Sequence, residues 1–211
     1  MHREWRVKGL SAADARHAAA LIYSSGPRSL SALFDVDDVH TALDFLGLAF
    51  AADEGQFSHR YHQGVHAPDG RLVGLVTHWH GPPSVAYRQA TLQLLLDYYG
   101  EESTRAVIGR SQCLAPVVTL PDADRWILGH LGVDPAFHRQ GIARSLVNAV
   151  EQAAQQAGCA TLGLDVEADN DTAIAFYQSI GFKPLERNEP DAQGASLGLV
   201  PHLFLSKSLA A

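Results

Sequence analysis

The segment FHRQGIARSLV, residues 137–147, decides how the chain folds, because it joins a strand pattern to a helix pattern through a glycine. The apolar run RWILGHLGV at 125–133 predicts a buried strand, and IARSLVNAVEQAAQQAG at 142–158 predicts an amphipathic helix that stops at Gly158. The run CATLGLDV at 159–166 predicts a second strand. A strand, a helix and a strand in this order predict a crossover between parallel strands.

The turn before this helix has the features of an anion-binding site. The first N–H groups of a helix have no intrahelical partner, and the helix dipole places partial positive charge beside them. Gly141 and Ala143 leave these amides uncovered, while Arg139 and Arg144 add positive charge. These features predict a phosphate-binding turn. The P-loop and Rossmann glycine patterns do not occur, which disfavours nucleotide hydrolysis and dinucleotide cofactors.

Other patterns predict helices and strands around this unit. Residues 4–10 predict a short strand, 11–25 predict a helix, and 29–51 predict a second helix or a pair. Near the other end of the chain, 170–182 predict a helix and 202–209 predict a closing strand. The apolar stripe expected along 29–51 consists of Val39, Leu43, Leu46 and Phe50. Residues 55–67 and 71–80 predict a β-hairpin, because the intervening PDG is a turn signal. The chain therefore has a mixed α/β pattern.

The segment 81–124 interrupts this order and is predicted to be a helical insertion between the third and fourth strands. It contains a predicted long helix and a shorter one after Gly100. The apolar stripe expected on the long helix consists of Val85, Leu92, Leu95 or Leu96, and Tyr99. Packing into the core is the expected role of this stripe, with a cover over the active site or a homodimer contact as alternatives.

Composition limits the class of protein. The 211 residues are 46% hydrophobic and 18% charged, with a net charge of −7. This predicts a single globular domain over 1–211 and disfavours a nucleic-acid partner. No signal peptide or membrane-spanning run is evident, so we expect no membrane partner and a cytoplasmic location. Cys113 and Cys159 are expected to be free thiols.

Two stretches together resemble the GNAT (GCN5-related) N-acetyltransferase family. The first is LGVDPAFHRQGIARSLVNAVEQAA, whose motif is formed by His138, Arg139, Gln140, Gly141, Ile142 and Ala143. The second is LDVEADNDTAIAFYQSIGF, whose motif is formed by Asn170, Ala173, Phe176, Tyr177, Gly181 and Phe182. The first motif departs from the family at His138, where a Gln or Arg is usual. The resemblance implies the GNAT acyl-CoA N-acyltransferase fold.

The resemblance also implies a cofactor site for acetyl-CoA or another short acyl-CoA. The backbone of Leu131, Gly132 and Val133 would pair with the pantetheine arm, and Asn170 would hydrogen-bond that arm. The pyrophosphate would be bound by the amides of Arg139, Gln140, Gly141, Ile142, Ala143 and Arg144. No metal is expected to take part.

Two residues are expected to be catalytic in direct attack of an amine on the thioester. Tyr177 stands where the family keeps a tyrosine beside the sulfur. Asp165 lies twelve residues earlier, at the spacing where ribosomal-protein acetyltransferases of this family place a glutamate. The family's usual fourth-strand base positions align with Ile127 and Gly129, which cannot accept a proton. Strand alternation predicts that the nearby His130 faces away from Gly129 and is structural, unless a bulge intervenes.

The acceptor stays open at this point. It is an amine of a small molecule, a polyamine or a protein α-amine, and weak base assistance favours an amine of low pKa. The alternative function is a CoA-binding sensor or assembly module without turnover, because the fourth-strand base is missing. A metal site at His78 and His80, which share a strand face, is a weaker alternative than solvated or packed histidines.

Overall fold

The crossover around residues 137–147 folds as its pattern predicts. Strand β4 (Arg125–Val133) leads through the turn into helix α5 (Ile142–Gln156), and strand β5 (Thr161–Glu167) follows as a parallel neighbour of β4. Gly158 ends the helix in a left-handed conformation with φ 77°, which glycine adopts without a clash of a Cβ atom.

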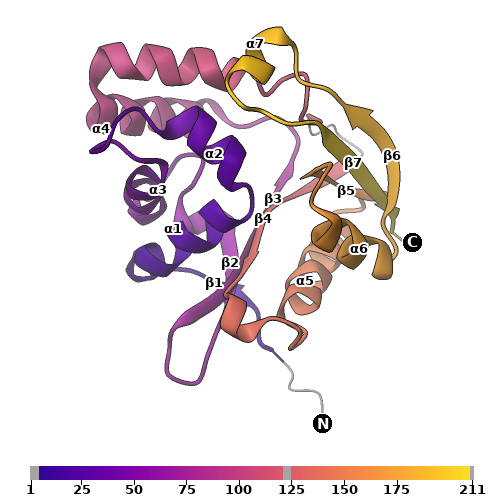
Figure 1. Ribbon diagram of the computed structural model, residues 1–211. Coiled ribbons are helices and arrows are strands. Elements are labelled where there is room, and N and C mark those ends of the chain that lie inside the picture. Colours follow the sequence, from indigo (N-terminus) through magenta and orange to yellow (C-terminus); the bar gives the residue numbers. More distant parts are fainter. Residues whose placement is uncertain (1–4, 121–124, 210–211) are drawn as a thin grey trace.

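Figure 1 shows the computed structural model, which describes residues 5–120 and 125–209. The described residues form one seven-stranded sheet in the order β1-β2-β3-β4-β5-β7-β6. Its other neighbouring strands pair in antiparallel fashion, so the sheet is mixed, as expected. The remaining strands are β1 (Lys8–Gly9), β2 (His62–His66), β3 (Leu72–His80), β6 (Lys183–Asn188) and β7 (His202–Ser208).

Helices cover both faces of this sheet. The remaining helices are α1 (Ala15–Ser24), α2 (Pro27–Phe34), α3 (Ala42–Ala51), α4 (Val85–Gln112), α6 (Asp171–Ser179) and α7 (Ala192–Ser196). Helices α1 to α4 lie on one side of β3 and β4, while α5 and α6 lie on the other (Figure 1). We call these two sides the α1 face and the α5 face.

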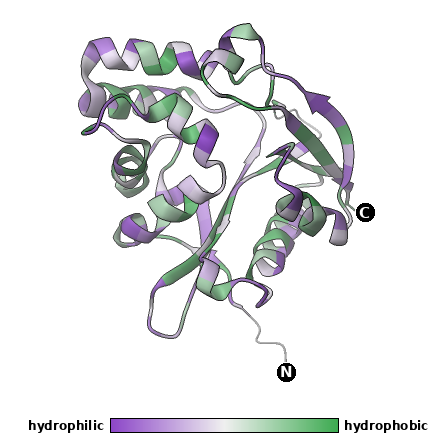
Figure 2. Ribbon diagram, in the orientation of Figure 1, coloured by the Kyte–Doolittle hydropathy of each residue, from purple (hydrophilic) through white to green (hydrophobic). Residues whose placement is uncertain are grey.

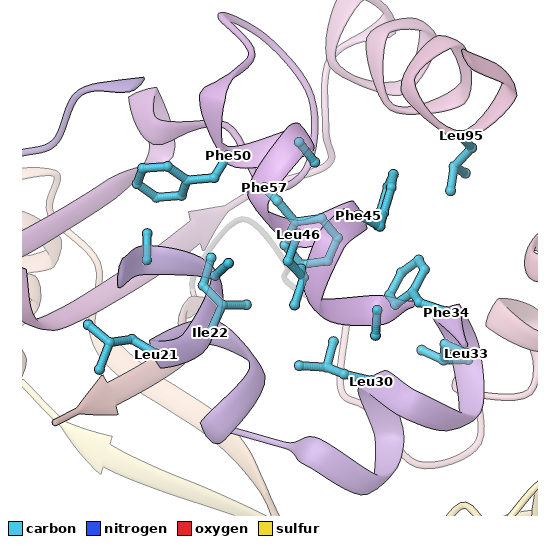
Figure 3. Close-up of a cluster of buried hydrophobic side chains, with 14 of the residues drawn as sticks. Leu21, Ile22, Leu30, Leu33, Phe34, Phe45, Leu46, Phe50, Phe57 and Leu95 are labelled. Atoms are coloured by element: carbon cyan, nitrogen blue, oxygen red, sulfur yellow. The ribbon is translucent and has the colours of Figure 1, made fainter. Parts of the chain in front are cut away.

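Each face has its own hydrophobic core. On the α1 face, α1, α2 and α3 contribute buried aromatic and aliphatic side chains, among them Ile22, Phe34, Phe45 and Phe50 (Figure 3). On the α5 face, buried residues of β3, β4 and β5 pack against the apolar stripe of α5 formed by Ile142, Leu146, Val147 and Val150. Burial of this much apolar surface on both faces fixes the sheet between two helical layers.

The stripe predicted for 29–51 is only half right. Leu46 and Phe50 are buried, but Val39 is 73% exposed and Leu43 is 44% exposed. The reason is a turn that precedes α3, in which Asp37 accepts hydrogen bonds from the backbone of the next residues. The turn ends the helical pattern, so Val39 lies outside any helix and α3 begins only at Ala42.

The segment 81–124 contains α4, whose two helical halves meet at a non-helical Gly100, close to the predicted break. Leu95 and Tyr99 pack into the core of the α1 face, as expected. Val85 is 60% exposed and Leu92 is 43% exposed, so core packing, the expected role of the stripe, is wrong for its N-terminal part. The alternative roles, a cover over the active site or a homodimer contact, remain predictions. Residues 121–124 lie outside the described residues. The single domain over 1–211 and the insertion at 81–124 remain predictions.

One strand that the patterns missed closes the sheet. β6 is an exposed edge strand and is mainly hydrophilic (Figure 2). Its sequence KPLERN carries charges and a proline, which blunt an edge against further pairing but give no alternating pattern. Among the described helices, none combines the length and the apolar character that a bilayer span requires.

The two central strands, β4 and β5, pair over only part of their length. Pairing between β4 and β5 begins at Arg125 and ends where Ile127 faces Gly163. Beyond this pair the described part of β4 continues to Val133 without a partner strand on its β5 side. We call residues 128–133 on that side the open β4 edge. Unpaired backbone groups on a strand edge can bond an extended ligand.

Candidate active site

The turn before α5 is held in an unusual backbone conformation. Gly141, at the N-cap of α5, has φ 85°, and Arg139 has φ 59°. A Cβ atom at Gly141 would meet nothing within 4 Å, so the requirement for glycine there is conformational rather than steric. A positive φ at a residue other than glycine is uncommon and often marks a functional turn.

The backbone amides of this turn have no hydrogen-bond acceptor among the described residues. None of the N–H groups of residues 139–144 donates a hydrogen bond to residues 5–120 or 125–209. The helical bonding of α5 starts when Ser145 N–H donates to Gly141 O at 3.0 Å. Six consecutive free amides at a helix N-terminus have the donor geometry that suits an anion.

Two side-chain contacts tie the turn to its surroundings. Trp5 Nε1 donates to the Gln140 carbonyl at 2.8 Å. His138, the residue that departs from the family motif, bonds through Nε2 to the Val133 carbonyl at 2.9 Å. His138 therefore links the end of β4 to the turn.

Tyr177 lies on α6, in the core of the α5 face. It is 7% exposed and packs against the rings of Phe176 and Phe182. Burial raises the pKa of its phenol above the ordinary value. The Tyr177 hydroxyl makes no hydrogen bond to the described residues, so it is a donor without a protein partner.

Asp165 of β5 lies on the side of the sheet opposite to Tyr177. Leu164 and Val166 on either side of it point into the core of the α5 face, so Asp165 points toward the α1 face. Its two carboxylate oxygens accept hydrogen bonds from Thr119, at 2.8 Å from the backbone N–H and 3.0 Å from the hydroxyl. Burial raises the pKa of Asp165, and the two bonds from Thr119 oppose that rise.

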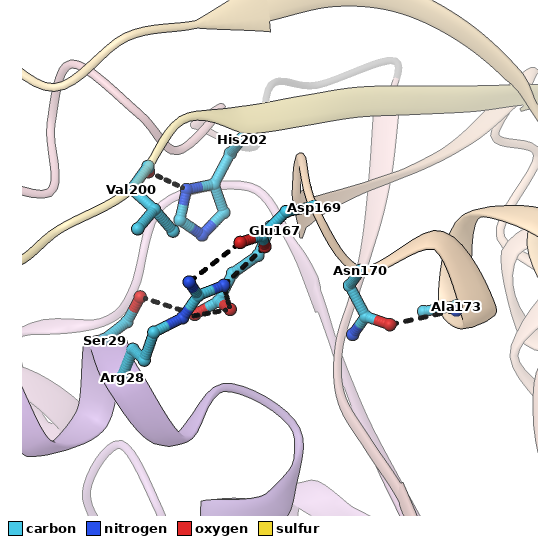
Figure 4. A network of polar contacts seen from close by, with 8 residues as sticks. All are labelled: Arg28, Ser29, Glu167, Asp169, Asn170, Ala173, Val200 and His202. Carbon is cyan, nitrogen blue, oxygen red and sulfur yellow. Dashed lines mark hydrogen bonds and ion pairs between the residues drawn. The ribbon is translucent and has the colours of Figure 1, made fainter.

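Asn170 caps α6, and its side-chain oxygen accepts the Ala173 N–H at 3.1 Å. That bond orients the amide and leaves its NH₂ group to donate elsewhere. Next to it, Arg28 of α2 is ion-paired with Glu167 and Asp169 at the end of β5 (Figure 4). These bonds raise the pKa of Arg28 and lower that of Asp169. The sequence patterns did not reveal this bridge, because its partners are distant in the chain.

His130 corrects the expectation drawn from strand alternation. The β3–β4 register shifts between the pairs Leu75–Gly132 and Thr77–Gly129, so β4 carries a bulge in which His130 has φ 47°. The bulge turns His130 onto the α1 face, where it contacts aromatic rings and Ser25. His130 and Gly129 therefore share a face, because the extra residue breaks the period of two.

His62 of β2 lies behind His130 and is 1% exposed. Desolvation lowers its pKa to about 4, and desolvation lowers the pKa of His130 to about 3. Both imidazoles are therefore neutral near neutral pH. The His62 Nδ1–H donates to the Ser58 carbonyl at 2.9 Å, which also fixes the tautomer of His62.

We predict that acid destabilises the fold through these two histidines. The unfolded chain binds protons on them below pH about 6.5, but the native state resists until about pH 4 or lower, so stability falls as pH drops through that window. His62 alone accounts for roughly 3 kcal/mol of lost unfolding free energy. Urea unfolding of wild type, His62→Gln and the exposed His17→Gln measures this. A pH dependence that is the same in all three proteins would contradict the prediction.

His78 and His80 share a strand face, as expected, and both pack against the Trp126 ring. Within the described residues, no group of three or more His, Cys, Asp and Glu side chains is arranged to hold a metal ion. The two cysteines, Cys113 and Cys159, are buried free thiols, as expected.

A comparison with known proteins shows the family to which the chain belongs. Residues 40–182 match the acetyltransferase (GNAT) family. The chain belongs to this family. Members of the GNAT family use an acyl-CoA as co-substrate, which accords with six free amides beside an unpaired strand edge.

The curated relatives cover part of the chain. The [ribosomal protein bS18]-alanine N-acetyltransferase of Escherichia coli K12 is 42% identical over 59 residues, which are 28% of this chain. The match spans 40% of the length of that relative. It therefore supports the GNAT core and leaves activity and substrate to be proposed.

Solved structures support the GNAT fold over nearly the whole chain. An N-acetyltransferase from Staphylococcus aureus Mu50 has a TM-score of 0.62 at 13% identity, covering 95% of this chain and 99% of its own. The ribosomal-protein-S18-alanine N-acetyltransferase from Escherichia coli has a TM-score of 0.52 at 17% identity, covering 99% and 96%. At such identities the likeness concerns the fold alone.

Proposed function

We propose that this GNAT protein transfers an acetyl group from acetyl-CoA to a primary amine by direct attack on the thioester. The observation that carries the proposal is the row of free amides at 139–144, next to the open β4 edge. One element suits a diphosphate and the other suits an extended amide-containing arm, and the two are joined by one short turn.

In this proposal each part of the cofactor has its own partner. The amides of residues 139–144 bind the pyrophosphate, and Arg139 and Arg144 add positive charge nearby. The backbone of Leu131, Gly132 and Val133 pairs with the pantetheine arm. The NH₂ group of Asn170 donates to the same arm. Acetyl-CoA is the proposed donor, and another short acyl-CoA would use the same contacts.

The chemistry needs a neutral amine, a stabilised oxyanion and a protonated leaving thiol. The amine nitrogen attacks the carbonyl carbon, the C–S bond breaks, and a backbone N–H of the open β4 edge stabilises the oxyanion. A phenol of pKa about 10 is a weaker acid than a thiol of about 8.5, and burial makes Tyr177 weaker still. Tyr177 therefore acts mainly by hydrogen-bonding the developing thiolate.

Asp165 is the proposed proton acceptor from the sequence pattern. Its raised pKa supports this role, because a carboxylate of higher pKa is a stronger base. The two bonds from Thr119 leave further lone pairs on its oxygens, through which a water can reach the amine.

An α-amine is the proposed acceptor. An α-amine of pKa about 8 is roughly a tenth neutral at pH 7, while a lysine amine of pKa about 10.4 is far less so. A site with weak base assistance therefore serves an α-amine best. The curated relatives act on the alanine of a ribosomal protein, which supports a protein or peptide α-amine over a polyamine.

A CoA-binding module without turnover remains the second candidate. It is favoured by Ile127 and Gly129, which leave the usual fourth-strand base positions without an ionisable group. Release of free thiol from acetyl-CoA with a panel of amines separates the two. Amine-dependent release supports the enzyme, and acetyl-CoA binding with no release for any amine supports the module.

We predict that Tyr177→Phe lowers kcat by about 100-fold while the dissociation constant for acetyl-CoA changes little. The phenol contributes when charge develops on sulfur, so its loss affects the chemical step more than binding. Single-turnover thiol release measures this. The matched variant Phe176→Leu lies next to Tyr177 and should retain kcat within a few-fold. Equal losses in both variants would assign the effect to packing.

A further inference from the structure

The β4 bulge brings an ionisable side chain to the open β4 edge, where alternation alone would have turned it away. His130 lies between Gly129 and the segment 131–133 that is proposed to hold the pantetheine arm. His130 as a whole residue is partly exposed, and its Nε2 is not fully buried, unlike Nε2 of His62, so a ligand at this edge can approach it. The proposed function leaves this histidine without a role.

Hydrogen bonding fixes which ring nitrogen of His130 carries the proton. The single hydroxyl proton of Ser25 is donated to the Ile22 carbonyl at 2.7 Å. The Ser25 oxygen lies 3.4 Å from His130 Nδ1 and can then only accept. Nδ1 therefore carries the hydrogen, and Nε2 of the neutral ring has a free lone pair. No described residue donates to that Nε2.

A second imidazole backs the first. The rings of His62 and His130 are stacked, with centroids 6.3 Å apart and planes inclined by 24°. His62 is buried, and its Nε2 has no hydrogen-bond partner among the described residues. A buried nitrogen without a hydrogen-bond partner lowers the stability of the fold. The presence of such a nitrogen on His62, next to His130, accords with a site that receives a hydrogen-bond donor.

The surroundings of His130 are aromatic. The ring of Phe57 is 5.4 Å from it and the ring of Trp79 is 5.7 Å away, measured between centroids. The contacts described for His130 include no carboxylate. A lone pair set in an aromatic wall suits a neutral amine, because an ammonium ion would find no counter-charge there.

We propose that Nε2 of His130 accepts a hydrogen bond from the attacking amine and orients it toward the thioester at the open β4 edge. This inference rests on the proposed function and deepens it. A neutral primary amine has two N–H donors and one lone pair. One N–H donates to Nε2 of His130, and the lone pair then points at the carbonyl carbon. The substrate class is a primary amine with an apolar neighbouring group, bound in its neutral form.

The kinetic test compares two variants of His130 that share the same backbone strain. Neither Phe nor Gln favours φ 47°, so His130→Phe and His130→Gln strain the bulge alike. Gln supplies an acceptor oxygen near the position of Nε2, whereas Phe keeps the ring and lacks the acceptor. The probe is a hexapeptide that begins with alanine, and the same peptide with a blocked N-terminus is the control.

We expect His130→Phe to raise KM for the peptide about 10-fold, the loss of one hydrogen bond, with KM for acetyl-CoA within about twofold of wild type. His130→Gln should restore most of the peptide KM. Equal changes of the peptide KM in both variants, or a peptide KM that His130→Phe leaves unchanged, would overturn the inference. If wild type releases thiol with the peptide, such a result leaves the proposed function standing. Failure of wild type with every amine would instead count against that function.

A second measurement does not depend on the variants folding. Long-range ¹H–¹⁵N spectra of histidine-labelled wild-type protein report which ring nitrogen of each imidazole is protonated, with the His130 signals assigned from a variant spectrum or by sequential correlation. We expect Nδ1–H at His130 and a change in its Nε2 shift when the alanine peptide is added with CoA bound. A proton on Nε2, or no change at saturating peptide, would overturn the inference.

Discussion

Ala143→Glu is expected to weaken acetyl-CoA binding by at least about 100-fold without loss of the fold. Ala143 is the second residue of α5 and is partly exposed. A carboxylate in the first turn interacts favourably with the helix dipole, by about 0.3–1 kcal/mol. The same carboxylate would repel the diphosphate, because unit charges 4 Å apart interact by about 4 kcal/mol near a protein surface.

The matched control is Ala143→Gln, which has nearly the same size and no charge. Isothermal calorimetry with acetyl-CoA gives the dissociation constants, and thermal melting checks the fold. We expect the glutamine variant to bind within about tenfold of wild type. If both variants bind equally well, charge at this turn has no part in cofactor binding, and the proposed phosphate site is wrong. Lowering ionic strength should widen the difference, since exposed charges are then less screened.

Gly132→Ala is expected to lower the free energy of unfolding by at least about 3 kcal/mol. A Cβ atom at Gly132 would lie 2.2 Å from the Leu21 carbonyl oxygen and 2.8 Å from its carbon. Both of these atoms are backbone atoms of α1, whereas Gly132 lies in β4, so no side chain can rotate away. The strand and the helix must separate, and the open β4 edge would move with the strand.

Gly109→Ala serves as the control for this substitution. Gly109 lies in the second half of α4, and a Cβ atom there would meet nothing within 4 Å. Alanine should stabilise this helix by about 0.5–1 kcal/mol. Urea unfolding of both variants gives the two effects with opposite signs. An unchanged unfolding midpoint for Gly132→Ala would show that α1 does not pack against β4 as closely as the structure has it.

Several parts of the fold and site were accessible from local patterns. The crossover and the phosphate-binding turn were predicted because each depends on residues that are close in sequence. A glycine that must adopt a positive φ, as at Gly70 of the hairpin and Gly158, is equally local. The amides at 139–144 are likewise a property of any helix N-terminus, so the candidate cofactor site could be placed from the sequence.

Other features were wrong because of a turn that the helical pattern did not reveal, or were missed because they depend on distant contacts. Val39 and Leu43 fit an apolar stripe but are exposed, because the turn at Asp37 delays the start of α3. Asp165 of β5 is bonded to Thr119, and Glu167 of β5 is ion-paired with Arg28 of α2. The partners in the first of these pairs are 46 residues apart in the chain, and those in the second are 139 residues apart. No local pattern could therefore indicate them.

The sequence by itself determined the strand-turn-helix unit and the free amides at its helix N-terminus, because backbone geometry near a glycine and a helix terminus is set within a few residues. Only the tertiary structure decided where His130 points and which of its ring nitrogens carries the proton. Its bulge arises from the register of β4 against β3, and its tautomer arises from Ser25 at the end of α1. Both depend on packing between segments that are far apart in the chain.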